Sequence, residues 1–443
     1  MKYSVITFGC RVNQSDSLEF EEQLRRAGAE PASPELADLV VVNTCSVTAS
    51  ADQGARQTIR RIARVNPAAK IVATGCYATR RPGDVAELPN VTRVVANDDK
   101  PHLLSLVKSI RLTPAADSHE PTTAERFGDG EGGCGAAIEP GVAGRTAYTL
   151  RVQTGCDEAC SYCIIPETRG APRSRPLEQV LSEAERVIGL GFKEVALTGV
   201  HLGSYGRDLT ARRSLLELLQ ALRDRFEGEG TSAPRALFRI SSLEPMDCGS
   251  DLVDLIARSR CFAPHFHLPL QHASARMLAA MQRPYGIEQY EALAAHIHAR
   301  MPHASIGTDL IVGFPGEADA DVDLLADYLE RSPLTHLHVF PYSDRPGTVA
   351  SMLGNRPDGT AVKARGKRVR DIGTALNRRF VESQVGAVHR ALTLEDGSTV
   401  VTGNYMKVRI PPGHRRNEWV TIRIEGASPT LTGEVVEKPA QSA

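Results

Sequence analysis

Three cysteines lie close together in the segment TGCDEACSYC, at Cys156, Cys160 and Cys163. Three neighbouring thiolates without an evident fourth ligand suit a cubane iron–sulfur cluster better than structural zinc, which normally takes four protein ligands. Such a cluster leaves one iron open, and an open iron can bind a small molecule. The alternative is a zinc site that a distant residue such as His201 completes. The segment therefore predicts a metal centre, and we favour a [4Fe-4S] cluster.

A second set of cysteines is dispersed in the sequence but regular in its surroundings. Cys10 occurs in ITFGCRVN, Cys45 in VVVNTCSVT and Cys76 in IVATGCYA, and each follows a short apolar run. If these runs are parallel strands, their carboxyl ends meet at one edge of a sheet, where open α/β folds bind ligands. We expect a second cluster there, whose open iron could carry an exogenous sulfur atom. The alternative is three half-buried core cysteines, because free cysteine is a common core residue.

The rest of the composition indicates a reducing compartment. No apolar run approaches the roughly 18 residues that span a bilayer, and the opening MKYSVITFGC lacks the features of a signal peptide. We therefore expect a cytoplasmic protein without a membrane partner. Structural disulfides are not expected there, and the odd count of 9 cysteines argues against full pairing. No role is assigned to Cys134, which lies in a glycine-rich stretch, or to Cys248 and Cys261.

Short apolar runs alternate with amphipathic stretches over residues 1–110, which predicts a doubly wound parallel-sheet domain. Strands are expected at 4–8, 38–42, 70–73 and 92–95. The segments SDSLEFEEQLRRAG and ADQGARQTIRRIARVNP are predicted helices, because each opens with a capping candidate and closes near Gly or Pro. Residues 111–144 are rich in Gly, Ala, Pro and Thr and lack a hydrophobic period, which predicts a flexible linker.

Strand–helix alternation returns over residues 145–377. Six strands are suggested by AYTLRVQ, EVALTG, ALFRISS, HFHLPL, ASIGTDLIVG and HLHVFPY. Six β/α units predict a partial barrel whose strand ends carry the active site. Residues 378–443 shift to the short alternating strands RALTLEDG, TVVTGNYMKVRI, EWVTIRIEG and LTGEVVE, which predict a small antiparallel, OB-like barrel. The fold class is thus α/β with three domains.

Charge is nearly balanced, with 52 Lys and Arg against 53 Asp and Glu, so a nucleic acid would have to bind local basic patches. One such patch is the helical segment VKARGKRVRDIGTALNRRF, although such a run is commonly a solvated helix face. Tyr405 and Trp419 of the small barrel could stack on bases. The candidate phosphate contacts are Lys363, Arg365, Lys367, Arg368, Arg370, Arg378, Arg379, Lys407, Arg415 and Arg416, with Arg173 and Arg175 in APRSRP.

Seven motifs together resemble those of the radical S-adenosylmethionine (SAM) methylthiotransferases, over nearly the whole chain. They are FGCRVNQSDS, NTCSVT, TGCYA, TGCDEACSYCIIPETRGAPRSRP, LTGVHLGSYG, HLPLQHAS and TDLIVGFPGE. The final barrel resembles the TRAM domain, an RNA-binding module often attached to these enzymes. GCRVN and LTGVHLGSYG are most similar to the branch that modifies N6-threonylcarbamoyladenosine at position 37 of tRNA. The branches that modify isopentenyladenosine-37 or an aspartate of a ribosomal protein are the alternatives.

This resemblance implies two [4Fe-4S] clusters and SAM as cofactors. The cluster of the C-x3-C-x2-C motif would reduce SAM to a deoxyadenosyl radical. A second SAM would methylate sulfur held by the other cluster, for transfer to carbon 2 of adenine. The residues expected to contact SAM are Tyr162, Gly199, Ser241, Gln271 and Gly313. The alternative for the glycines and the serine is that they simply form the turns after strands. Expected partners are the tRNA anticodon stem-loop, an electron donor such as flavodoxin or ferredoxin, and a sulfur donor.

Two other classes of function remain open. A different radical SAM reaction would need no stored sulfur on the first domain. A metal-containing RNA-binding protein without catalysis would not cleave SAM when reduced. Two open three-cysteine sites and a six-unit β/α domain exceed what binding alone requires, which favours the enzyme.

Overall fold

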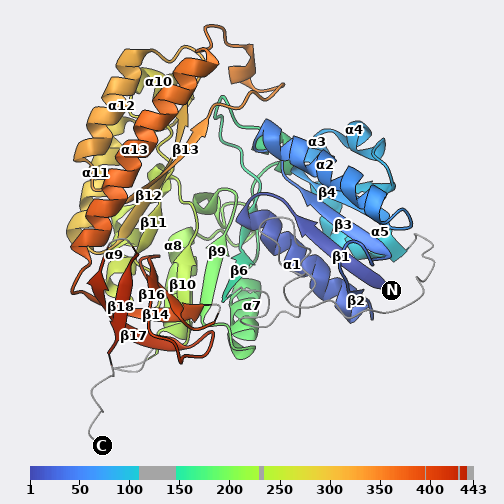
Figure 1. The fold of residues 1–443 in the computed structure, drawn as a ribbon, viewed down its shortest axis with the longest axis horizontal. Helices are drawn as coiled ribbons and strands as arrows, with labels where there is room; N and C mark the ends of the chain where they lie inside the picture. The colour runs from blue at the N-terminus through green and yellow to red at the C-terminus, as the bar shows by residue number, and fades with distance from the viewer. Residues whose placement is uncertain (109–145, 229–233, 395, 428–429, 437–443) are drawn as a thin grey trace, which may run out of the picture.

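The computed structural model describes residues 1–108, 146–228, 234–394, 396–427 and 430–436 (Figure 1). The linker predicted at 111–144, including Cys134, lies outside the described residues. The chain forms an N-terminal parallel sheet, a central set of parallel strands and a closed C-terminal barrel. The predicted α/β fold class is therefore confirmed.

The N-terminal domain is built on one parallel sheet. Its strands are β1 (Lys2–Thr7), β2 (Glu30–Pro31), β3 (Leu39–Thr44), β4 (Lys70–Gly75) and β5 (Val91–Val95), and its helices are α1 (Arg11–Arg26), α2 (Ala49–Val65), α3 (Cys76–Arg80), α4 (Pro82–Ala86) and α5 (Leu103–Lys108). The strand order is β2-β1-β3-β4-β5. Alternate side chains of β3 face opposite sides, so Val42 packs in the core under α2 and Val41 in the core under α1. Helices on both faces make the predicted doubly wound domain.

The central domain contains six parallel strands with helices between them. The strands are β6 (Ala147–Arg151), β9 (Glu194–Thr198), β10 (Leu237–Ile240), β11 (His265–His267), β12 (Ser305–Val312) and β13 (His336–Pro341), and the larger helices are α7 (Leu177–Gly189), α8 (Leu215–Phe226), α9 (Ser250–Arg258), α11 (Ile287–Arg300) and α12 (Asp319–Arg331). The sheets β10-β9-β6 and β11-β12-β13 are linked by a parallel bridge between Phe238 and Phe262. The result is the partial barrel that the sequence predicts.

Helix α13 (Gly359–Ser383) joins the barrel to the C-terminal domain. It begins at Asp358, whose carboxylate accepts the N–H groups of Thr360 and Ala361. The predicted boundary at 377/378 falls inside this helix, and Phe380 near its end packs in the core of the small barrel. The two domains therefore share one continuous helix. None of the helices that the structure describes is long and apolar enough to cross a membrane.

The C-terminal domain is a closed five-stranded barrel in the order β14-β15-β16-β18-β17. The strands are β14 (Val388–Leu394), β15 (Thr399–Thr402), β16 (Lys407–Arg409), β17 (Trp419–Gly426) and β18 (Thr432–Val435). The single strand predicted at 399–410 is wrong, because the chain reverses at Tyr405 (φ +69°) and β15 pairs antiparallel with β16. The barrel is also not wholly antiparallel, since β16 pairs in parallel with β18.

A buried charge cluster holds the N-terminal domain against the barrel. Asp16 on α1 forms ion pairs with Lys100 (2.6 Å, Nζ to Oδ2), with Arg151 of β6 and with Arg169 (3.4 Å). Burial opposes ionisation of Asp16, but the three cations hold its pKa well below the ordinary value. Because an unpaired buried charge is costly, this cluster fixes how the two domains sit together.

Arg173 and Arg175, which were predicted to guide a substrate phosphate, contact the N-terminal domain in this structure. Arg173 pairs with Asp98 at 2.6 Å, and Arg175 pairs with Glu19. Both carboxylates belong to the N-terminal domain. The basic APRSRP segment therefore serves domain docking in this structure.

Candidate active site

Cys10, Cys45 and Cys76, the N-terminal trio, come together at one edge of the first sheet. Cys10 is the N-cap of α1 after β1, Cys45 follows β3, and Cys76 begins α3 directly after β4. These three strands are neighbours in the sheet, so their carboxyl ends meet as expected. Burial, together with the neighbouring Cys10 and Cys76 thiols, raises the pKa of Cys45 to about 12. A thiolate at this position therefore requires a metal or a cation beside it.

Glycine precedes two of these cysteines for a steric reason. Gly9 has φ +91°, and a Cβ atom added there would lie 2.5 Å from the Cys45 Sγ atom. Gly75 has φ +94°, and its added Cβ would overlap the Thr44 carbonyl oxygen. Both conformations belong to the left-handed region that glycine adopts without strain. The glycines in FGC and TGC thus let the backbone close around the three sulfurs.

Two polar side chains reach the Cys76 sulfur. Arg169, on α6 (Ile165–Arg169) of the central domain, lies beside this thiol, which raises the pKa of Arg169 against the effect of burial, and donates to Asn13 Oδ1 at 2.6 Å. The Asn97 side-chain amide donates to the same sulfur at 3.7 Å. Sequence reasoning missed Arg169 as a site residue, although it lies in the quoted ETRG segment. Donors of this kind stabilise negative charge on sulfur.

Cys156, Cys160 and Cys163, the central trio, lie on the loop between β7 (Gln153–Thr154) and α6. The Cys163 N–H donates to the Cys160 carbonyl oxygen at 3.0 Å, which curls the loop so that the three thiols influence one another. Burial raises the pKa of Cys163 to about 12 and also raises that of Cys160. The predicted C-x3-C-x2-C loop is thus a compact set of sulfur donors.

Arg283 is a buried cation that sequence reasoning missed. Its Nη1 atom donates to Cys160 Sγ at 3.1 Å and to the Tyr162 hydroxyl at 3.4 Å. It also forms an ion pair with Glu244, and its Nε atom donates to the Tyr285 hydroxyl at 3.0 Å. Tyr162, which was predicted to contact SAM, therefore helps to orient the guanidinium that faces the central trio.

Neither trio is spaced like the ligands of a single ion. Tetrahedral zinc at about 2.3 Å from each sulfur would bring its ligands to within about 3.8 Å of one another. Among the described residues, the groups with ligand atoms within 4.8 Å of one another are His267, Asp309 and His338, and Asp157, Glu158 and His201. The trios are not among them. Three sulfur donors at wider spacing fit a polynuclear iron–sulfur cluster.

His201, the distant residue named in the zinc alternative, lies beside one cysteine of the central trio. Its Nδ1 atom lies 3.9 Å from Cys156 Sγ, and its Nε2 atom lies 2.7 Å from Asp247 Oδ2. Burial opposes protonation, but the bonds to Asp247 and Cys156 raise the pKa of His201 to about 10. Asp247 thus favours the protonated ring, which can donate from Nδ1 to the Cys156 sulfur.

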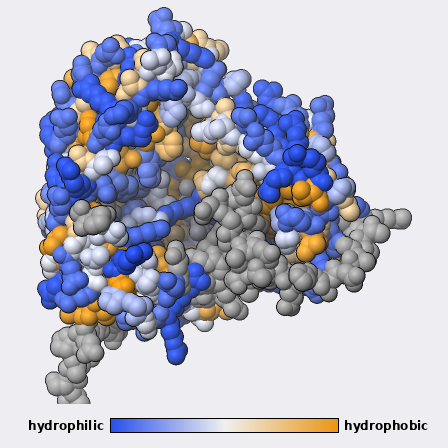
Figure 2. All heavy atoms as spheres, in the orientation of Figure 1, coloured by the Kyte–Doolittle hydropathy of each residue, from blue (hydrophilic) through white to orange (hydrophobic). Residues whose placement is uncertain are grey.

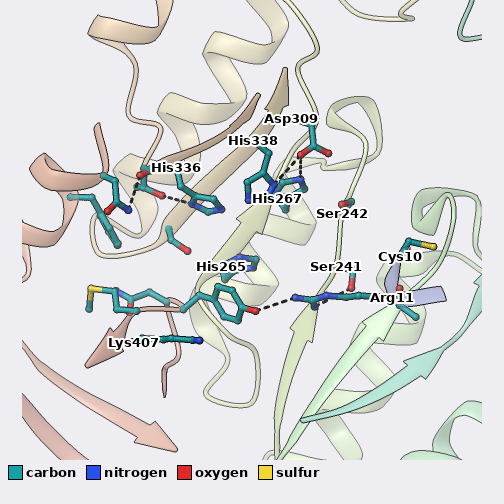
Figure 3. A pocket seen from close by; sticks show the side chains of 18 of the residues that line it. Cys10, Arg11, Ser241, Ser242, His265, His267, Asp309, His336, His338 and Lys407 are labelled. Atoms are coloured by element: carbon teal, nitrogen blue, oxygen red, sulfur yellow. Dashed lines mark hydrogen bonds and ion pairs between the residues drawn. The ribbon is translucent and has the colours of Figure 1, made fainter. Parts of the chain in front are cut away.

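A cavity of about 1160 Å³ opens between the three domains (Figures 2 and 3). Cys10 and Arg11 line it from the N-terminal domain, and Lys407 lines it from the small barrel. Figure 2 shows the surface hollowed between the central and N-terminal domains. The volume exceeds that of many small-molecule sites, so a cofactor and part of a larger substrate fit together.

Gly199 and Ser241, two of the expected SAM contacts, line this cavity beyond the ends of β9 and β10. A Cβ atom on Gly199 would lie 3.0 Å from Gln153 Oε1, so the backbone approaches its neighbours closely. The Ser241 hydroxyl lies 3.4 Å from Arg11 Nη1. Both positions leave polar groups at the cavity wall that a ligand can reach.

Gln271 and Gly313, the other expected SAM contacts, are not among the described residues that line the cavity. Gln271 has φ +68°, and its N–H donates to the Asp309 carbonyl oxygen at 2.9 Å. Gly313 has φ +76°, and its N–H donates to Glu317 Oε2 at 2.9 Å under Val362 of α13. In the structure, both residues thus form backbone hydrogen bonds next to strands.

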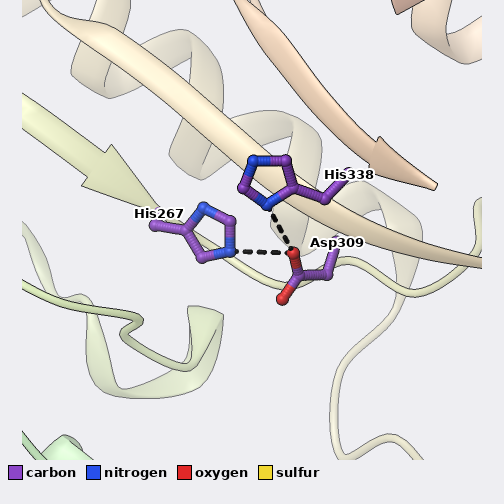
Figure 4. Close-up of side chains that lie close together, drawn as sticks. All are labelled: His267, Asp309 and His338. Carbon is purple, nitrogen blue, oxygen red and sulfur yellow. Dashed lines mark hydrogen bonds and ion pairs between the residues drawn. The ribbon is translucent and has the colours of Figure 1, made fainter. Parts of the chain in front are cut away.

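Four histidines and Asp309 line the cavity on β11, β12 and β13. The Asp309 Oδ1 atom lies 3.0 Å from His267 Nε2 and 3.1 Å from His338 Nδ1 (Figure 4). Burial opposes ionisation of Asp309, but these two bonds hold its pKa well below the ordinary value. The bond to Asp309 raises the pKa of His338, whereas burial lowers that of His336 to about 4 and also lowers that of His265.

Sequence reasoning missed this histidine cluster, although a signal existed. Histidines two residues apart occur in HFHLPL and again in HLHVFPY. Residues i and i+2 of a strand share a face, so each pair had to point to the same side.

Two arginines of the basic run on α13 hold this helix against α12 and the turn before it. Arg365 bonds Glu317 at 2.8 Å and Asp319 at 2.7 Å, and Arg368 bonds Asp323 at 2.5 Å. The Arg365 side chain is only 12% exposed. Its predicted role as a phosphate contact is therefore wrong, because its charge is already neutralised within the protein.

Three of the other predicted RNA contacts do converge. Arg378, Tyr405 and Lys407 line the cavity, and the Tyr405 ring is exposed. Trp419 is placed differently, since the Arg390 guanidinium stacks 3.9 Å from its ring centre. Tyr405 is thus an aromatic side chain of the barrel that lines the cavity.

Comparisons with known proteins agree with this geometry. Residues 2–97 match the model of uncharacterized protein family UPF0004, and residues 150–329 match that of the radical SAM superfamily. The threonylcarbamoyladenosine tRNA methylthiotransferase MtaB of Aquifex aeolicus is 36% identical over 92% of this chain and 96% of its own. The ribosomal protein uS12 methylthiotransferase RimO of Salinispora tropica is 33% identical over 91% of this chain and 85% of its own.

A solved structure supports the fold. The radical SAM methyltransferase TsrM from Kitasatospora setae, with tryptophan and a SAM analogue bound, aligns with a TM-score of 0.56 at 16% identity, over 79% of this chain and 75% of its own. A radical SAM domain uses SAM and a [4Fe-4S] cluster, which the donor chemistry and spacing of the central trio fit. With relatives of at least 30% identity along nearly its whole length, the chain belongs to the radical SAM methylthiotransferases.

Proposed function

We propose that the protein adds a methylthio group to carbon 2 of N6-threonylcarbamoyladenosine at position 37 of tRNA. The observation that carries the proposal is that Cys10 of the N-terminal trio lines the same cavity as Gly199 and Ser241. A sulfur site and a SAM site would then face one space, in which the target base can meet both. The name of the 36% identical relative supports the choice of substrate.

In this proposal the two trios have different tasks. When bound to the central trio, a [4Fe-4S] cluster supplies the electron that cleaves SAM. Arg283 donates to Cys160 and balances the negative charge of the thiolates. The N-terminal trio would hold a second [4Fe-4S] cluster and the sulfur to be transferred, with Arg169 and Asn97 as donors to Cys76.

The cavity walls would position the substrate and exclude water. Gly199 and Ser241 are proposed to contact SAM at the strand ends, and Tyr405 to stack on a base of the anticodon loop. Arg378 and Lys407 would bind neighbouring phosphates or acidic groups. The proposal further includes an electron donor such as flavodoxin or ferredoxin, a separate sulfur donor, and action in the cytoplasm where tRNA is modified.

The test is mass spectrometry of tRNA nucleosides from cells that lack the gene. We expect 2-methylthio-N6-threonylcarbamoyladenosine to disappear and N6-threonylcarbamoyladenosine to accumulate. Wild-type protein should restore the modification, and Cys163→Ser should not. Cys248→Ser is the matched control, because this buried cysteine belongs to neither trio and should restore it.

Unchanged nucleosides would contradict the proposal. Loss of the isopentenyladenosine derivative instead would assign the enzyme to that branch. The second candidate is methylthiolation of ribosomal protein uS12, which the 33% identical RimO relative favours. Mass spectrometry of that protein from the same cells distinguishes it.

A further inference from the structure

Arg11 is a cation in the cavity whose described partners are neutral. Its guanidinium lies 3.4 Å from the Ser241 hydroxyl and 3.5 Å from the Tyr405 hydroxyl (Figure 3). Both distances exceed those of good hydrogen bonds. Within the described ranges, no carboxylate pairs with it, whereas the nearby Arg169 and Arg239 both have acidic partners. A half-buried guanidinium with two weak neutral partners keeps most of its donors available for an anion.

The surroundings of Arg11 favour a negative ligand. Arg11 is the first residue of α1, where the helix dipole adds positive potential. Lys407 lines the same cavity, and no ion pair to it occurs in the described part of the chain. The buried Nδ1 atom of His265, also at the cavity, lacks a hydrogen-bond partner among the described residues. This corner therefore combines two available cations with an unsatisfied polar group.

The position of Arg11 next to Cys10 narrows the kind of anion. In adenine, carbon 2 and the carbon that carries N6 both neighbour ring nitrogen N1. A group that holds the N6 arm must therefore lie close to the sulfur that attacks carbon 2. The threonylcarbamoyl arm ends in a carboxylate, whereas an isopentenyl arm is an uncharged hydrocarbon. Planar carboxylates match the donor fork of a guanidinium.

We propose that Arg11 binds the carboxylate of the threonyl arm and so selects an acidic N6 substituent over an apolar one. The Tyr405 hydroxyl and Lys407 complete the site from the small barrel. This inference rests on the function proposed above, and it names the side chain that recognises the substrate. A backbone phosphate of the RNA is the other anion that Arg11 could bind. The experiment below distinguishes the phosphate from the threonyl carboxylate.

The experiment measures binding rather than turnover. Two anticodon stem-loop RNAs are compared by fluorescence anisotropy with the full-length, cluster-loaded protein. One carries N6-threonylcarbamoyladenosine at position 37, and the other carries the same group with its carboxylate converted to a carboxamide. We expect the wild-type protein to bind the first RNA more tightly, on the order of 10- to 100-fold, because charged hydrogen bonds are lost in the second.

Arg11→Gln should bring this ratio of affinities close to one. The matched control is Arg409→Gln, an exposed arginine of β16 that does not line the cavity, and it should keep the wild-type ratio. Damage to the cluster beside Arg11 would weaken both RNAs alike and leave the ratio unchanged, so it cannot imitate the expected result.

Three results would overturn the proposal. They are equal binding of the two RNAs by the wild-type protein, binding of neither RNA, and an Arg11→Gln variant that weakens both equally. The last result, in a variant whose iron content is unchanged, would make Arg11 a phosphate contact. The nucleoside experiment above could still succeed in each case, so failure here is distinct from failure of the proposed function.

Discussion

Replacing Asp16 by asparagine should loosen the contact between the N-terminal domain and the barrel. The Asp16 side chain is 1% exposed and pairs with Lys100, Arg151 and Arg169. Asparagine keeps the shape but removes the charge, which leaves the nearly buried Lys100 and Arg169 without their carboxylate. Because breaking a buried ion pair from one side costs about 3–5 kcal/mol, we expect the free energy of opening this interface to fall by that amount.

The assay is native-state hydrogen exchange read by mass spectrometry on peptides from α1 and β6. Global unfolding is less suitable because a chain of several domains does not unfold in one step. Fluorescence is also unsuitable, since the single tryptophan, Trp419, lies in the small barrel. Glu19→Gln is the matched control on the same helix. Its 31% exposed carboxylate should contribute less than about 1 kcal/mol.

The pH dependence follows from the lowered pKa of Asp16 in the folded state. A depressed carboxyl pKa stabilises the fold at every pH above the unfolded value of about 3.9, and this stabilisation is lost as the pH falls toward the folded value. The difference between wild type and Asp16→Asn should therefore be the same at pH 7 and pH 5 and shrink only in stronger acid. Equal exchange in Asp16→Asn and Glu19→Gln at pH 7 would refute the argument.

Three other perturbations have defined outcomes. Gly75→Ala forces a Cβ into the Thr44 carbonyl at positive φ, so we expect the free energy of local opening at β4 to fall by about 1–3 kcal/mol in hydrogen exchange, and iron to be lost from the N-terminal trio in a metal assay. Cys163→Ser should abolish reductive SAM cleavage while Mössbauer spectra keep the signal of the other cluster. His338→Asn should lower the free energy of local opening at β13 by less than about 1 kcal/mol in hydrogen exchange, because the side chain is 54% exposed. Since Asp309 raises the pKa of His338, that cost should be present below pH 6.5 and be lost as the pH rises through the raised pKa of the folded state.

The two cysteine trios could be predicted because their geometry is local. Each N-terminal cysteine directly follows an apolar strand, and parallel strands place such positions at one edge. The partial barrel was predictable for the same reason, since each β/α unit has its own hydrophobic pattern. The sequence does not reveal which cation faces which sulfur. Arg283 lies 123 residues from Cys160, and only the closed barrel brings them together.

Errors arose where distant residues decide the role of a local pattern. The basic run on α13 predicted a nucleic-acid patch. In the structure, Arg365 and Arg368 pair with acidic residues of α12, which lie about 45 residues earlier in the chain. The turn at Tyr405 was missed although Gly403 and Asn404, which precede it, are typical of a hairpin turn. The histidine cluster needs the pairing of β11, β12 and β13, which no single segment specifies.

The unequal exposure of the N-terminal trio has a consequence for handling the enzyme in air. Cys45 and Cys76 are buried, whereas Cys10 is exposed and lines the cavity. Oxidants attack exposed thiolates first, so oxygen that enters the cavity meets the Cys10 corner before the others. A substrate seated in the cavity covers this corner. Protein saturated with its RNA should therefore tolerate oxygen longer than free protein, and idle enzyme should be the form that decays.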